Sequence, residues 1–394
     1  MSETADFVVV GLGAMGSAAL LALARQGVRV VGIDRFRPPH DRGSTHGETR
    51  LSRMAVGEGG EYAPLVARTH ALWREMGEAV GETLFIETGG LIIGQREGAP
   101  ALHGQPDFVR RSRDVARAHG VAHEMLEAGE LMRRFPQFVV GEESWALYEP
   151  TAGMALVERC VAAQLRLAED AGGLVLTGER VLGVREVVGG AVVSTDRREI
   201  SAAGVVVAAG AWVAELVGAM APLTRVQRQT MHWFAVADAA SYAPGRFPVF
   251  IWTHGRNEAD YLYGFPIVPG GAGVKLGSEQ YVETTTADGV ARAVTAAESA
   301  ALFRDHIEGR LDGVTPEVLR AVTCLYTTTP DHGFIVDHPP AMPHVLVASP
   351  CSGHGFKHSA ALGEMIAERV LRPGLVFGTG AAEAGPFRLA RFTA

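Results

Sequence analysis

The sequence predicts a mixed α/β protein of two domains, one a Rossmann-like domain with a parallel sheet and the other an α+β domain built on a mainly antiparallel sheet. Three observations support this prediction: a glycine-rich strand, turn and helix near the N-terminus, later apolar strands that again stop at a glycine turn, and a middle stretch in which apolar and polar residues alternate. The chain has 394 residues, more than one hydrophobic core usually holds, so two domains are expected.

The N-terminal unit reads DFVVVGLGAMG over residues 6–16. Its apolar start is rich in β-branched residues and predicts a buried parallel strand. Gly11, Gly13 and Gly16 then follow the GxGxxG spacing. In that spacing the first glycine permits a tight turn, the second lets the backbone approach a pyrophosphate, and the third packs the helix on the strand. The helix that follows, SAALLALARQG, presents its N-terminal amides to phosphates.

A second strand at 28–33 ends at Asp34, at the right distance along the chain to accept a hydrogen bond from a ribose hydroxyl. The chain shows the parts of a dinucleotide-binding unit in their usual order: a strand, the glycines, a helix, a second strand and an acid. The alternative is that the glycines only serve tight packing, but this would not require the other parts. An acid rather than an arginine at this place argues against NADP and leaves FAD and NAD open.

The composition excludes several classes of protein. With 47% hydrophobic residues, 20% charged residues and a net charge of −8, we expect a globular protein without a basic surface for nucleic acid or an anionic membrane. No apolar run approaches the roughly 20 residues that span a bilayer, and the opening MSETADF lacks the features of a signal peptide. The three cysteines fit neither a disulfide framework nor a CxxC metal site, so we expect a cytoplasmic protein without a metal.

Residues 35–61 hold too much glycine, proline and charge for a core segment. Ser44 or Thr45 can cap a helix that begins near Gly47. On such a helix three basic side chains lie on or near one face: His46, Arg50 and Arg53. Arginines at the positive end of a helix dipole favour a nearby anion, although a solvated charged face explains the pattern equally well.

The next part of the chain predicts further helices and strands. We expect a helix at 62–78, paired strands at 84–94 with a Gly-Gly turn, a loop and long helix within 147–173, a strand at 174–176, a hairpin within 181–200, and a strand at 204–209 that returns to the first sheet. Residues 100–135 show helical periodicity but no evident chemistry.

The antiparallel sheet is predicted from residues 217–320, with a helical stretch at 287–309. The last strand, HVLVASP, is followed by the glycine turn CSGHGFKHS and the helix AALGEMIAERVL. We therefore assign residues 1–83, 150–216 and 321–394 to a discontinuous nucleotide-binding domain. Residues 84–149 and 217–320 are assigned to a substrate-binding domain.

Three further side chains each have two interpretations. Lys357 lies at the start of the last helix, where an anion such as a reduced flavin or a substrate carboxylate would relieve the dipole, but an exposed lysine is the common alternative. Lys275 in GVKLG is either an edge-strand gatekeeper or a cation that favours electron transfer from a flavin to oxygen. Cys324 is, by its residue type, a small buried hydrophobe, and Tyr326 shares its face if the segment is extended.

Six motifs occur together in this chain: GxGxxG, STHGETRLSR, YGFP, GVKLG, TCLYTTTPDHGFIVD and SGHGFKHS. In this order and spacing they resemble the family of monomeric sarcosine oxidases and N-methyltryptophan oxidases. The resemblance runs nearly end to end, to the closing FRLARF. The glycine motif is common to many flavoproteins, whereas CxYTxxPDxxFIxD followed by SGHGFK is highly specific.

The resemblance implies an FAD attached through an 8α-S-cysteinyl thioether, with Cys324 as the matching cysteine. It credits Lys275 with oxygen activation and implies that Arg53 and Lys357 hold the substrate carboxylate. The implied catalytic residues are Lys275, His46, Arg50 and Tyr326, and the implied substrate-binding residues are Arg53, Lys357, Tyr263 and Glu279. The implied FAD contacts are Gly11, Gly13, Ala14, Met15, Gly16, Asp34, Arg35, Ser44, Thr45, Thr49, Val181, Gly210, Cys324, Gly353, His354, Gly355 and Lys357.

The chain also departs from the family. Glu279 stands where the family has a histidine four residues after the lysine, and Cys351 replaces a larger residue before SGHGFK. The lysine lies one residue further from YGFP than in sarcosine oxidase. An acid in the cavity argues against sarcosine itself and suits a substrate with a second amine.

The resemblance thus implies a monomeric, FAD-containing oxidase of a small secondary α-amino acid. Such an enzyme passes a hydride to the flavin, reduces O2 to hydrogen peroxide and releases an imine that hydrolyses. The open substrates are N-methyltryptophan, sarcosine, a cyclic imino acid such as pipecolate or proline, and a glycated amino acid. An NAD-dependent dehydrogenase and a non-catalytic flavin-binding subunit are the alternatives of other kinds.

Overall fold

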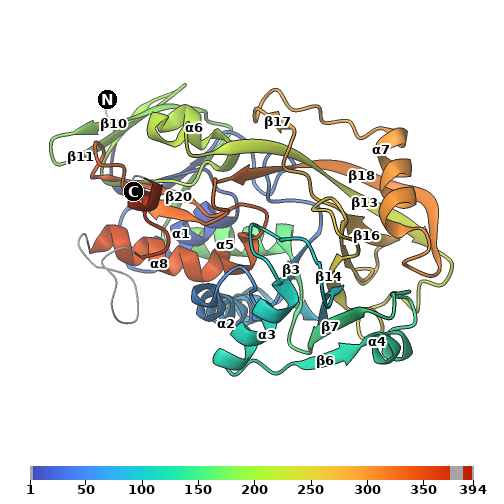
Figure 1. Ribbon diagram of the computed structural model, residues 1–394. Helices are drawn as coiled ribbons and strands as arrows, with labels where there is room; N and C mark the ends of the chain where they lie inside the picture. Colours follow the sequence, from blue (N-terminus) through green and yellow to red (C-terminus); the bar gives the residue numbers. More distant parts are fainter. Residues whose placement is uncertain (1–2, 373–384, 393–394) are drawn as a thin grey trace.

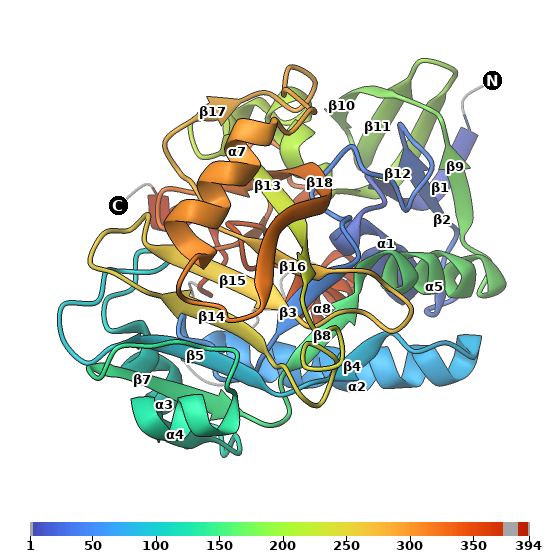
Figure 2. The ribbon, with the colours of Figure 1, turned by 90° about the vertical axis from the view of Figure 1, so that its right-hand side faces the viewer.

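The computed structural model describes residues 3–372 and 385–392, and within these ranges the chain forms two large sheets and one small sheet. Figures 1 and 2 show the two large sheets side by side, with helices packed on both. The predicted α/β class is confirmed. The predicted domain boundaries stay a prediction, and residues 1–2, 373–384 and 393–394 of the predicted nucleotide-binding domain lie outside the described ranges.

The first sheet has five parallel strands in the order β9, β2, β1, β12 and β20. The late strand β12 pairs with the N-terminal strand β1, so the return of the chain to the first sheet is confirmed. The antiparallel hairpin of β10 and β11 extends from the first half of β12, and β19 pairs with β20. The strands are β1 (Glu3–Val10), β2 (Val30–Asp34), β9 (Leu174–Thr177), β10 (Val181–Val187), β11 (Gly190–Thr195), β12 (Glu199–Val207), β19 (Ile335–Asp337) and β20 (Val345–Ser349).

Helices cover one face of this sheet because their apolar sides and the β-branched strands share one hydrophobic core. The helix α1 (Ala14–Ala24) lies centrally and packs against α5 (Val157–Asp170) and α8 (Ser359–Leu371), and α2 (Ala63–Val80) packs against both of these (Figure 1). The short α6 (Val213–Leu216) follows β12 and contributes to a second core on the opposite face. The two hydrophobic cores, one on each face of the sheet, hold the ends of β1 and β2 in place.

The second sheet is mainly antiparallel, as predicted, and follows the order β17, β13, β16, β15, β14, β5, β7 and β6, with β18 also paired to β13. Its one parallel contact joins β5 to β14. The strands are β5 (Gly90–Gln95), β6 (Glu124–Glu127), β7 (Ser144–Glu149), β13 (Arg225–Val236), β14 (Val249–Thr253), β15 (Tyr261–Phe265), β16 (Val274–Gly277), β17 (Thr284–Thr285) and β18 (Val314–Thr328). Helices α3 (Phe108–Ala118), α4 (Ala128–Arg134) and α7 (Ala296–Leu302) accompany it.

The long strands β13 and β18 pair antiparallel over most of their length and run from the second sheet towards the first (Figure 1). Cys324 pairs with Gln229, and Tyr326 pairs with Gln227 two residues further along. Because side chains alternate along a strand, Cys324 and Tyr326 lie on the same face. The strand therefore delivers both side chains to the space between the sheets.

The predicted helix near Gly47 is wrong. Gly47 has φ 89° and Glu48 has φ 73°, and both values lie in the left-handed region, which interrupts a right-handed helix. The carboxylate of Glu158 accepts hydrogen bonds from both of these backbone N–H groups. The chain then forms β3 (Thr49–Ser52), which pairs in the small sheet with β8 (Gly153–Leu156), and β8 pairs in turn with β4 (Phe85–Glu87).

Other expectations need smaller corrections. The strands within 84–94 do not form a hairpin, because β4 belongs to the small sheet and β5 to the second sheet. The loop expected before α5 contains β7 and β8. The helix expected from residue 287 begins at Ala296, where Thr295 and Glu298 form a capping box, and ends in a π-helical turn (Phe303–Ile307). The stretch 35–61 is not wholly outside the core, since Ala55 and Val56 are fully buried.

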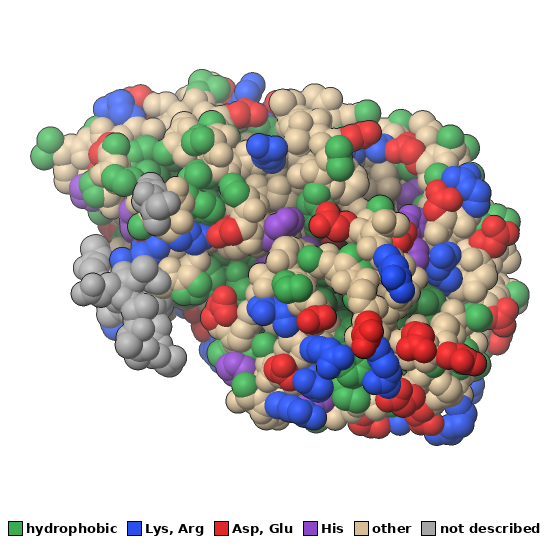
Figure 3. Space-filling model, in the orientation of Figure 1, with side chains coloured by type: hydrophobic (Ala, Val, Ile, Leu, Met, Phe, Trp, Pro, Cys, Tyr) green, Lys and Arg blue, Asp and Glu red, His purple; other side chains and the backbone are tan. Residues whose placement is uncertain are grey.

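The surface carries charges of both signs. In the lower right of Figure 3, over the region that Figure 1 labels α4 and β6, basic and acidic side chains are interspersed. Arg134 pairs there with Glu124 and Glu130 at 2.9 and 3.3 Å. Such exposed pairs contribute little to stability, so this face is best described as solvated. Among the described residues, no helix is long and apolar enough to cross a membrane.

Candidate active site

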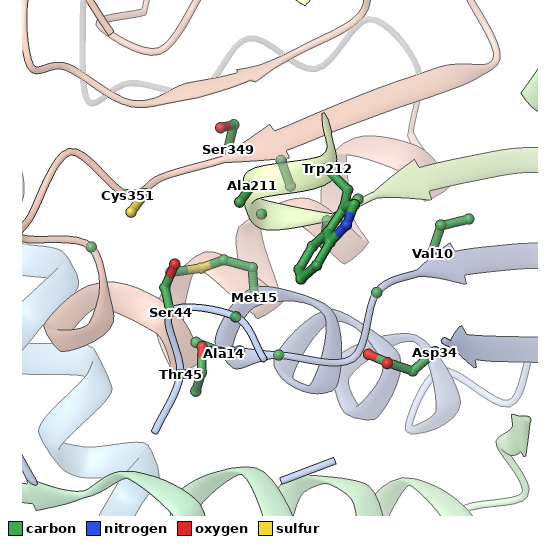
Figure 4. A pocket seen from close by; sticks show the side chains of 18 of the residues that line it. Val10, Ala14, Met15, Asp34, Ser44, Thr45, Ala211, Trp212, Ser349 and Cys351 are labelled. Atoms are coloured by element: carbon green, nitrogen blue, oxygen red, sulfur yellow. Dashed lines mark hydrogen bonds between the residues drawn. The ribbon is translucent and has the colours of Figure 1, made fainter. Parts of the chain in front are cut away.

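A deep cavity of about 200 Å³ opens at the carboxyl ends of β1 and β2, where a doubly wound sheet places its ligands. Figure 4 shows its wall: Asp34 lies at the end of β2, Met15 and Ala14 at the start of α1, and the indole of Trp212 points into the space. Ser44 and Thr45 approach from the loop after β2, and Cys351 lies, like them, on the side of the view away from Asp34 (Figure 4). The cavity is thus built by segments from both ends of the chain.

The glycine turn fits the phosphates of a dinucleotide. Gly11 has φ 86°, and a Cβ on it would lie 2.6 Å from the carbonyl oxygen of Ala208. A Cβ on Gly16 would overlap the carbonyl oxygen of Gly11, so this glycine packs helix on strand. The N-cap of α1 is Gly13, which offers no side-chain cap, and this end of the helix borders the cavity. Its first amides are therefore available to a bound anion.

Asp34 is nearly buried and lies at the ribose position that the sequence predicts. Its Oδ2 accepts a hydrogen bond of 2.8 Å from the backbone N–H of Leu12, and its Oδ1 accepts one of 2.7 Å from that of Phe36. A carboxylate has further lone pairs, so these bonds orient Asp34 and leave it able to accept from a ribose. The donor set of this cavity therefore fits FAD.

Most of the predicted FAD contacts lie on this cavity: Gly11, Gly13, Ala14, Met15, Asp34, Arg35, Ser44, Thr45, Val181, Gly210, Gly353 and Gly355. Cys324, His354 and Lys357 line the second cavity described below. Gly16 and Thr49 line neither, since Gly16 packs inside the glycine turn and Thr49 lies in β3. Trp212 was missed by sequence reasoning, although its AAGAW context repeats the strand and glycine turn of the first unit.

A second, smaller cavity of about 70 Å³ adjoins the first. The two share four lining residues: Arg50, Tyr326, Gly353 and Phe356. Of the eight predicted catalytic and substrate-binding residues, seven line this second cavity: Lys275, Arg50, Tyr326, Arg53, Lys357, Tyr263 and Glu279. A group bound in the first cavity can therefore meet a small molecule in the second.

His46, the eighth, is buried but lines neither cavity. Burial, followed by the charge of Arg50, lowers its pKa to about 4, so the imidazole is neutral. Its Nε2 has no hydrogen-bond partner among the residues that the structure describes. His46 therefore packs behind Arg50, a position from which it contacts the site only through its neighbours.

Arg50 lies where the two cavities join. Its guanidinium donates hydrogen bonds of 2.8 Å to the carbonyl oxygens of Thr49 and Ser44, and its Nη2 lies 3.5 Å from the Sγ of Cys324. Cys324 is 1% exposed and lines the second cavity beside that cation. The sulfur of Cys324 therefore lies close to the wall that the two cavities share.

Lys275 is buried in the middle of the second sheet. Its strand β16 lies between β13 and β15, so the edge-strand interpretation is wrong. The Nζ donates to the carbonyl oxygens of Gly47 at 2.6 Å and Thr49 at 2.7 Å, and to the Oγ1 of Thr49 at 3.3 Å. Burial and the nearby Arg50 lower the pKa of Lys275, while the three acceptors match the three hydrogens of an ammonium.

Arg53 and Lys357 converge on one carboxylate, that of Glu58. Arg53 Nη2 lies 2.9 Å from Glu58 Oε2, and Lys357 Nζ lies 3.3 Å from Glu58 Oε1. Burial raises the pKa of Glu58, but the two cations outweigh it and hold the pKa well below its usual range. Burial lowers the pKa of Lys357 to about 8. The exposed-lysine interpretation of Lys357 is wrong, since only 4% of the residue is exposed.

A second carboxylate, Glu279, lies in the same cavity with three donors. The hydroxyl of Tyr326 donates to its Oε1 at 2.9 Å, and the hydroxyl of Tyr281 donates to its Oε2 at 2.7 Å. The Nε2 of His103 lies 3.1 Å from Oε2. His103 comes from the stretch where the sequence shows no evident chemistry, so that expectation is wrong. A His-Gly turn with left-handed φ values of 50° and 72° brings it there.

Two distant carboxylates hold the segment that carries Arg50 and Arg53. Glu149 accepts hydrogen bonds of 2.8 Å from the backbone N–H groups of Met54 and Ala55. Glu158 holds the turn at Gly47 from the first turn of α5. These long-range contacts replace the helix that the local sequence predicts, and they keep both arginines aimed at the cavity.

The chain contains only two lysines, Lys275 and Lys357, and both line the second cavity. All other basic side chains besides histidine are arginines. Among the residues that the structure describes, His, Cys, Asp and Glu side chains do not gather into a group able to hold a metal ion.

Comparison with known proteins shows what the chain is similar to. A family model described as FAD dependent oxidoreductase matches residues 6–369. The monomeric sarcosine oxidase of Bacillus sp. (strain NS-129) is 34% identical over 371 residues, covering 93% of each chain. The N-methyl-L-tryptophan oxidase of Salmonella enteritidis PT4 (strain P125109) is 32% identical over 390 residues, covering 98% of this chain and 99% of that one.

Two solved structures share the fold at lower identity. NikD, an unusual amino acid oxidase of nikkomycin biosynthesis, has a TM-score of 0.79 and 23% identity, with 96% of each chain covered. The glycine oxidase of Geobacillus kaustophilus has a TM-score of 0.72 and 20% identity, covering 96% of this chain and 97% of that one.

Proposed function

The chain belongs to the family of FAD-dependent oxidoreductases, and from this premise we propose that it is an oxidase of N-methylated or other secondary α-amino acids. The enzyme would act on the CH–NH group of its donor as a monomer in the cytoplasm. The observation that supports this most directly is the convergence of Arg53 and Lys357 on a single carboxylate, in a cavity that adjoins the larger cavity at the glycine turn. The same two cations can hold the carboxylate of an amino acid.

Arg53 and Lys357 orient the substrate in this proposal. A bidentate guanidinium and an ammonium fix the carboxylate, and this fixes the C–H bonds next to the substrate nitrogen relative to the shared wall of the two cavities. When the substrate carboxylate binds, it must replace the carboxylate of Glu58 as the partner of these two cations. Tyr263 and Tyr326 pack around the remaining part of the substrate, and both keep their hydroxyl protons because burial raises their pKa values.

FAD, when bound, accepts a hydride from the amine and passes two electrons to O2, which yields hydrogen peroxide and an imine that hydrolyses in water. Gly11, Gly13 and the start of α1 would hold its pyrophosphate and Asp34 its ribose. The thiol of Cys324, beside Arg50, is the group we propose for the covalent attachment. Lys275 supplies a cation where O2 is reduced, because the first product of electron transfer to oxygen is anionic.

The substrate side chain distinguishes the proposed function from its close alternatives. Another secondary amine, such as proline, pipecolate or a glycated amino acid, would use the same carboxylate site. An NAD-dependent dehydrogenase or a non-catalytic flavin-binding subunit would not consume O2 when given an amino acid.

A peroxide-coupled assay of the purified chain tests the proposal. We expect a flavin absorption spectrum and oxygen-dependent peroxide production with one or more N-methyl amino acids, and a screen that also holds amines and cyclic imino acids identifies the class. A chain without flavin bands refutes the FAD assignment. A flavin-loaded chain that oxidises none of these compounds refutes the oxidase.

A further inference from the structure

The carboxylate of Glu279 already has three hydrogen-bonding neighbours from the protein itself. Its Oε1 accepts from Tyr326, and its Oε2 accepts from Tyr281 and faces the Nε2 of His103 at 3.1 Å. All four side chains lie deep in the protein, and Glu279 and His103 are almost completely shielded from solvent. An acid in this position, taken alone, suits a second amine on the substrate, but the contacts show that the place of that amine is already taken by an imidazole.

His103 joins the two carboxylates of the cavity. Its Nε2 faces Glu279, and its Nδ1 lies 3.4 Å from the Oε1 of Glu58. Burial lowers the pKa of His103, but the carboxylates of Glu279 and Glu58 outweigh it and raise the pKa to about 9. The ring is therefore an imidazolium at neutral pH, held between two anions.

The charges of this end of the cavity can be counted. The positive groups are Arg53, Lys357 and His103, and the negative groups are Glu58 and Glu279, which leaves one positive charge in excess. Of the other titratable groups near the cluster, His332, His354 and His358 have lowered pKa values and are neutral, and Tyr261, Tyr281 and Tyr326 have raised ones and are neutral too. The carboxylate of Glu149 also interacts with Arg53, but it lies outside the cavity lining and accepts hydrogen bonds from the backbone N–H groups of Met54 and Ala55, so it is not part of the count. One substrate carboxylate brings the cluster to zero.

Arg50 and Lys275 also line this cavity, and Arg50 lines the larger cavity at the glycine turn as well. Both donate hydrogen bonds to backbone oxygens, and among the described residues neither donates one to Glu279 or His103. Their contribution to the ratio of two ligands' Kd values is the same in each variant, so it cancels when that ratio is compared between variants.

We infer that His103 is a specificity-determining residue, whose imidazolium balances Glu279 and restricts the site to α-amino acids with an uncharged side chain. This inference rests on the proposed function and names the substrate class of the same site. A cationic side chain would leave one uncompensated positive charge in a buried site, and an anionic side chain would leave one negative charge. Both cost free energy because the site is poorly solvated.

Two single variants change the charge count in opposite directions, and the double variant leaves it unchanged. His103→Gln removes one positive charge and keeps a hydrogen-bond donor of similar reach, so the site should come to favour a ligand with one carboxylate and one ammonium. Glu279→Gln removes one negative charge and should favour a dicarboxylate. The double variant His103→Gln/Glu279→Gln returns to the wild-type charge and should again favour a monocarboxylate.

Calorimetric titration of the FAD-loaded enzyme with butanoate, 4-aminobutanoate and succinate measures this directly. These acids share a carboxylate and a short chain, and they end in a neutral, a cationic and an anionic group. We expect the Kd of 4-aminobutanoate relative to butanoate to fall about tenfold or more in His103→Gln, as one charge in a site of reduced dielectric implies. The Kd of succinate relative to butanoate should fall similarly in Glu279→Gln, and the double variant should restore both ratios.

The outcomes separate this inference from the proposed function. A merely structural role of His103 would weaken all three acids together in each variant, and unchanged ratios would overturn the inference. If the wild type oxidises neutral N-methyl amino acids but the Kd ratios are unchanged in the variants, the proposed function is supported and only the inference about His103 is refuted. A wild type that binds none of the three acids has no carboxylate site, which overturns both.

Discussion

The Nζ of Lys275 lies 2.6 Å from the carbonyl oxygen of Gly47, to which it donates a hydrogen bond across the boundary between the second sheet and the turn before β3. The same nitrogen lies 4.6 Å from the ring centre of Phe265 and 5.6 Å from that of Trp233. Burial, followed by the charge of Arg50, lowers the pKa of this amine well below its usual value, whereas the oxygen acceptors and aromatic faces around it favour the charged form. The amine therefore lies at a defined point of the cavity wall, where we propose that it acts as a cation.

Replacing that cation should affect the oxygen reaction. In Lys275→Met we expect flavin reoxidation to slow by orders of magnitude, while anaerobic reduction by substrate stays largely intact, because only the oxygen reaction develops negative charge there. Stopped-flow spectroscopy measures the two half-reactions separately. Arg320→Met is the matched control, since Arg320 covers the ring of Trp233 but lines neither cavity. Equal oxygen reactivity in Lys275→Met contradicts the role.

The attachment of FAD can be tested by acid precipitation. Wild-type protein should keep its yellow chromophore in the pellet, and Cys324→Ala should release it into the supernatant, because the thioether needs the sulfur beside Arg50. Cys351→Ala is the control: Cys351 also lines the larger cavity at the glycine turn, yet its replacement should leave the chromophore in the pellet. Free flavin from the wild type would rule out the covalent link.

Glu58 can be tested as the resident partner of the two substrate-binding cations. Glu58→Gln leaves Arg53 and Lys357 buried without their carboxylate, and we expect a loss of stability of about 3 kcal/mol. A small carboxylate should replace the missing charge, so acetate should raise the Tm of Glu58→Gln more than that of the wild type. Thermal denaturation with and without acetate measures this, with chloride at equal ionic strength for comparison. Glu61→Gln, at an exposed neighbour, should behave like the wild type.

The imidazolium of His103 predicts a pH dependence of stability. Its pKa is raised from 6.5 to about 9 in the folded protein, so the folded state binds this proton more tightly than the unfolded state. The contribution, about 3 kcal/mol, is fully present below pH 6.5 and is lost as the pH rises to about 9. Urea unfolding between pH 6 and 8 should show the first part of this decline in the wild type, because above about pH 8 the lowered pKa of Lys357 acts in the opposite direction. The decline should be absent from His103→Gln and present in His119→Gln, an exposed control; an unchanged slope in His103→Gln disproves the assignment.

Much of the fold was accessible from local patterns. The spacing of Gly11, Gly13 and Gly16 predicts the strand before the turn and the helix after it, because each of these positions has a steric requirement for glycine. The strand 199–207 could be assigned to the first sheet because an apolar run that ends at a glycine turn is buried on both faces.

The site was harder to predict because distant contacts decide its local structure. The turn at Gly47 is held by Glu158, more than a hundred residues away, and no pattern near Gly47 reports this contact. The cations Arg53 and Lys357 were identified by resemblance, but their partner Glu58 was not, since a glutamate in a glycine-rich stretch looks like a solvated one. The sequence around His103 shows a His-Gly turn but no pattern typical of a site residue, and only the tertiary fold brings this side chain next to Glu279.

The scarcity of lysine has a practical consequence. Because Lys275 and Lys357 are both shielded inside, reagents that acylate or cross-link the ε-amino groups of lysine find none on the outside of the folded enzyme. Coupling to a solid support through lysine should therefore fail with the folded protein, and a chemistry directed at arginine is required instead. Conversely, lysine acylation detected by mass spectrometry reports that the interior has opened, which makes these two amines a built-in probe of unfolding.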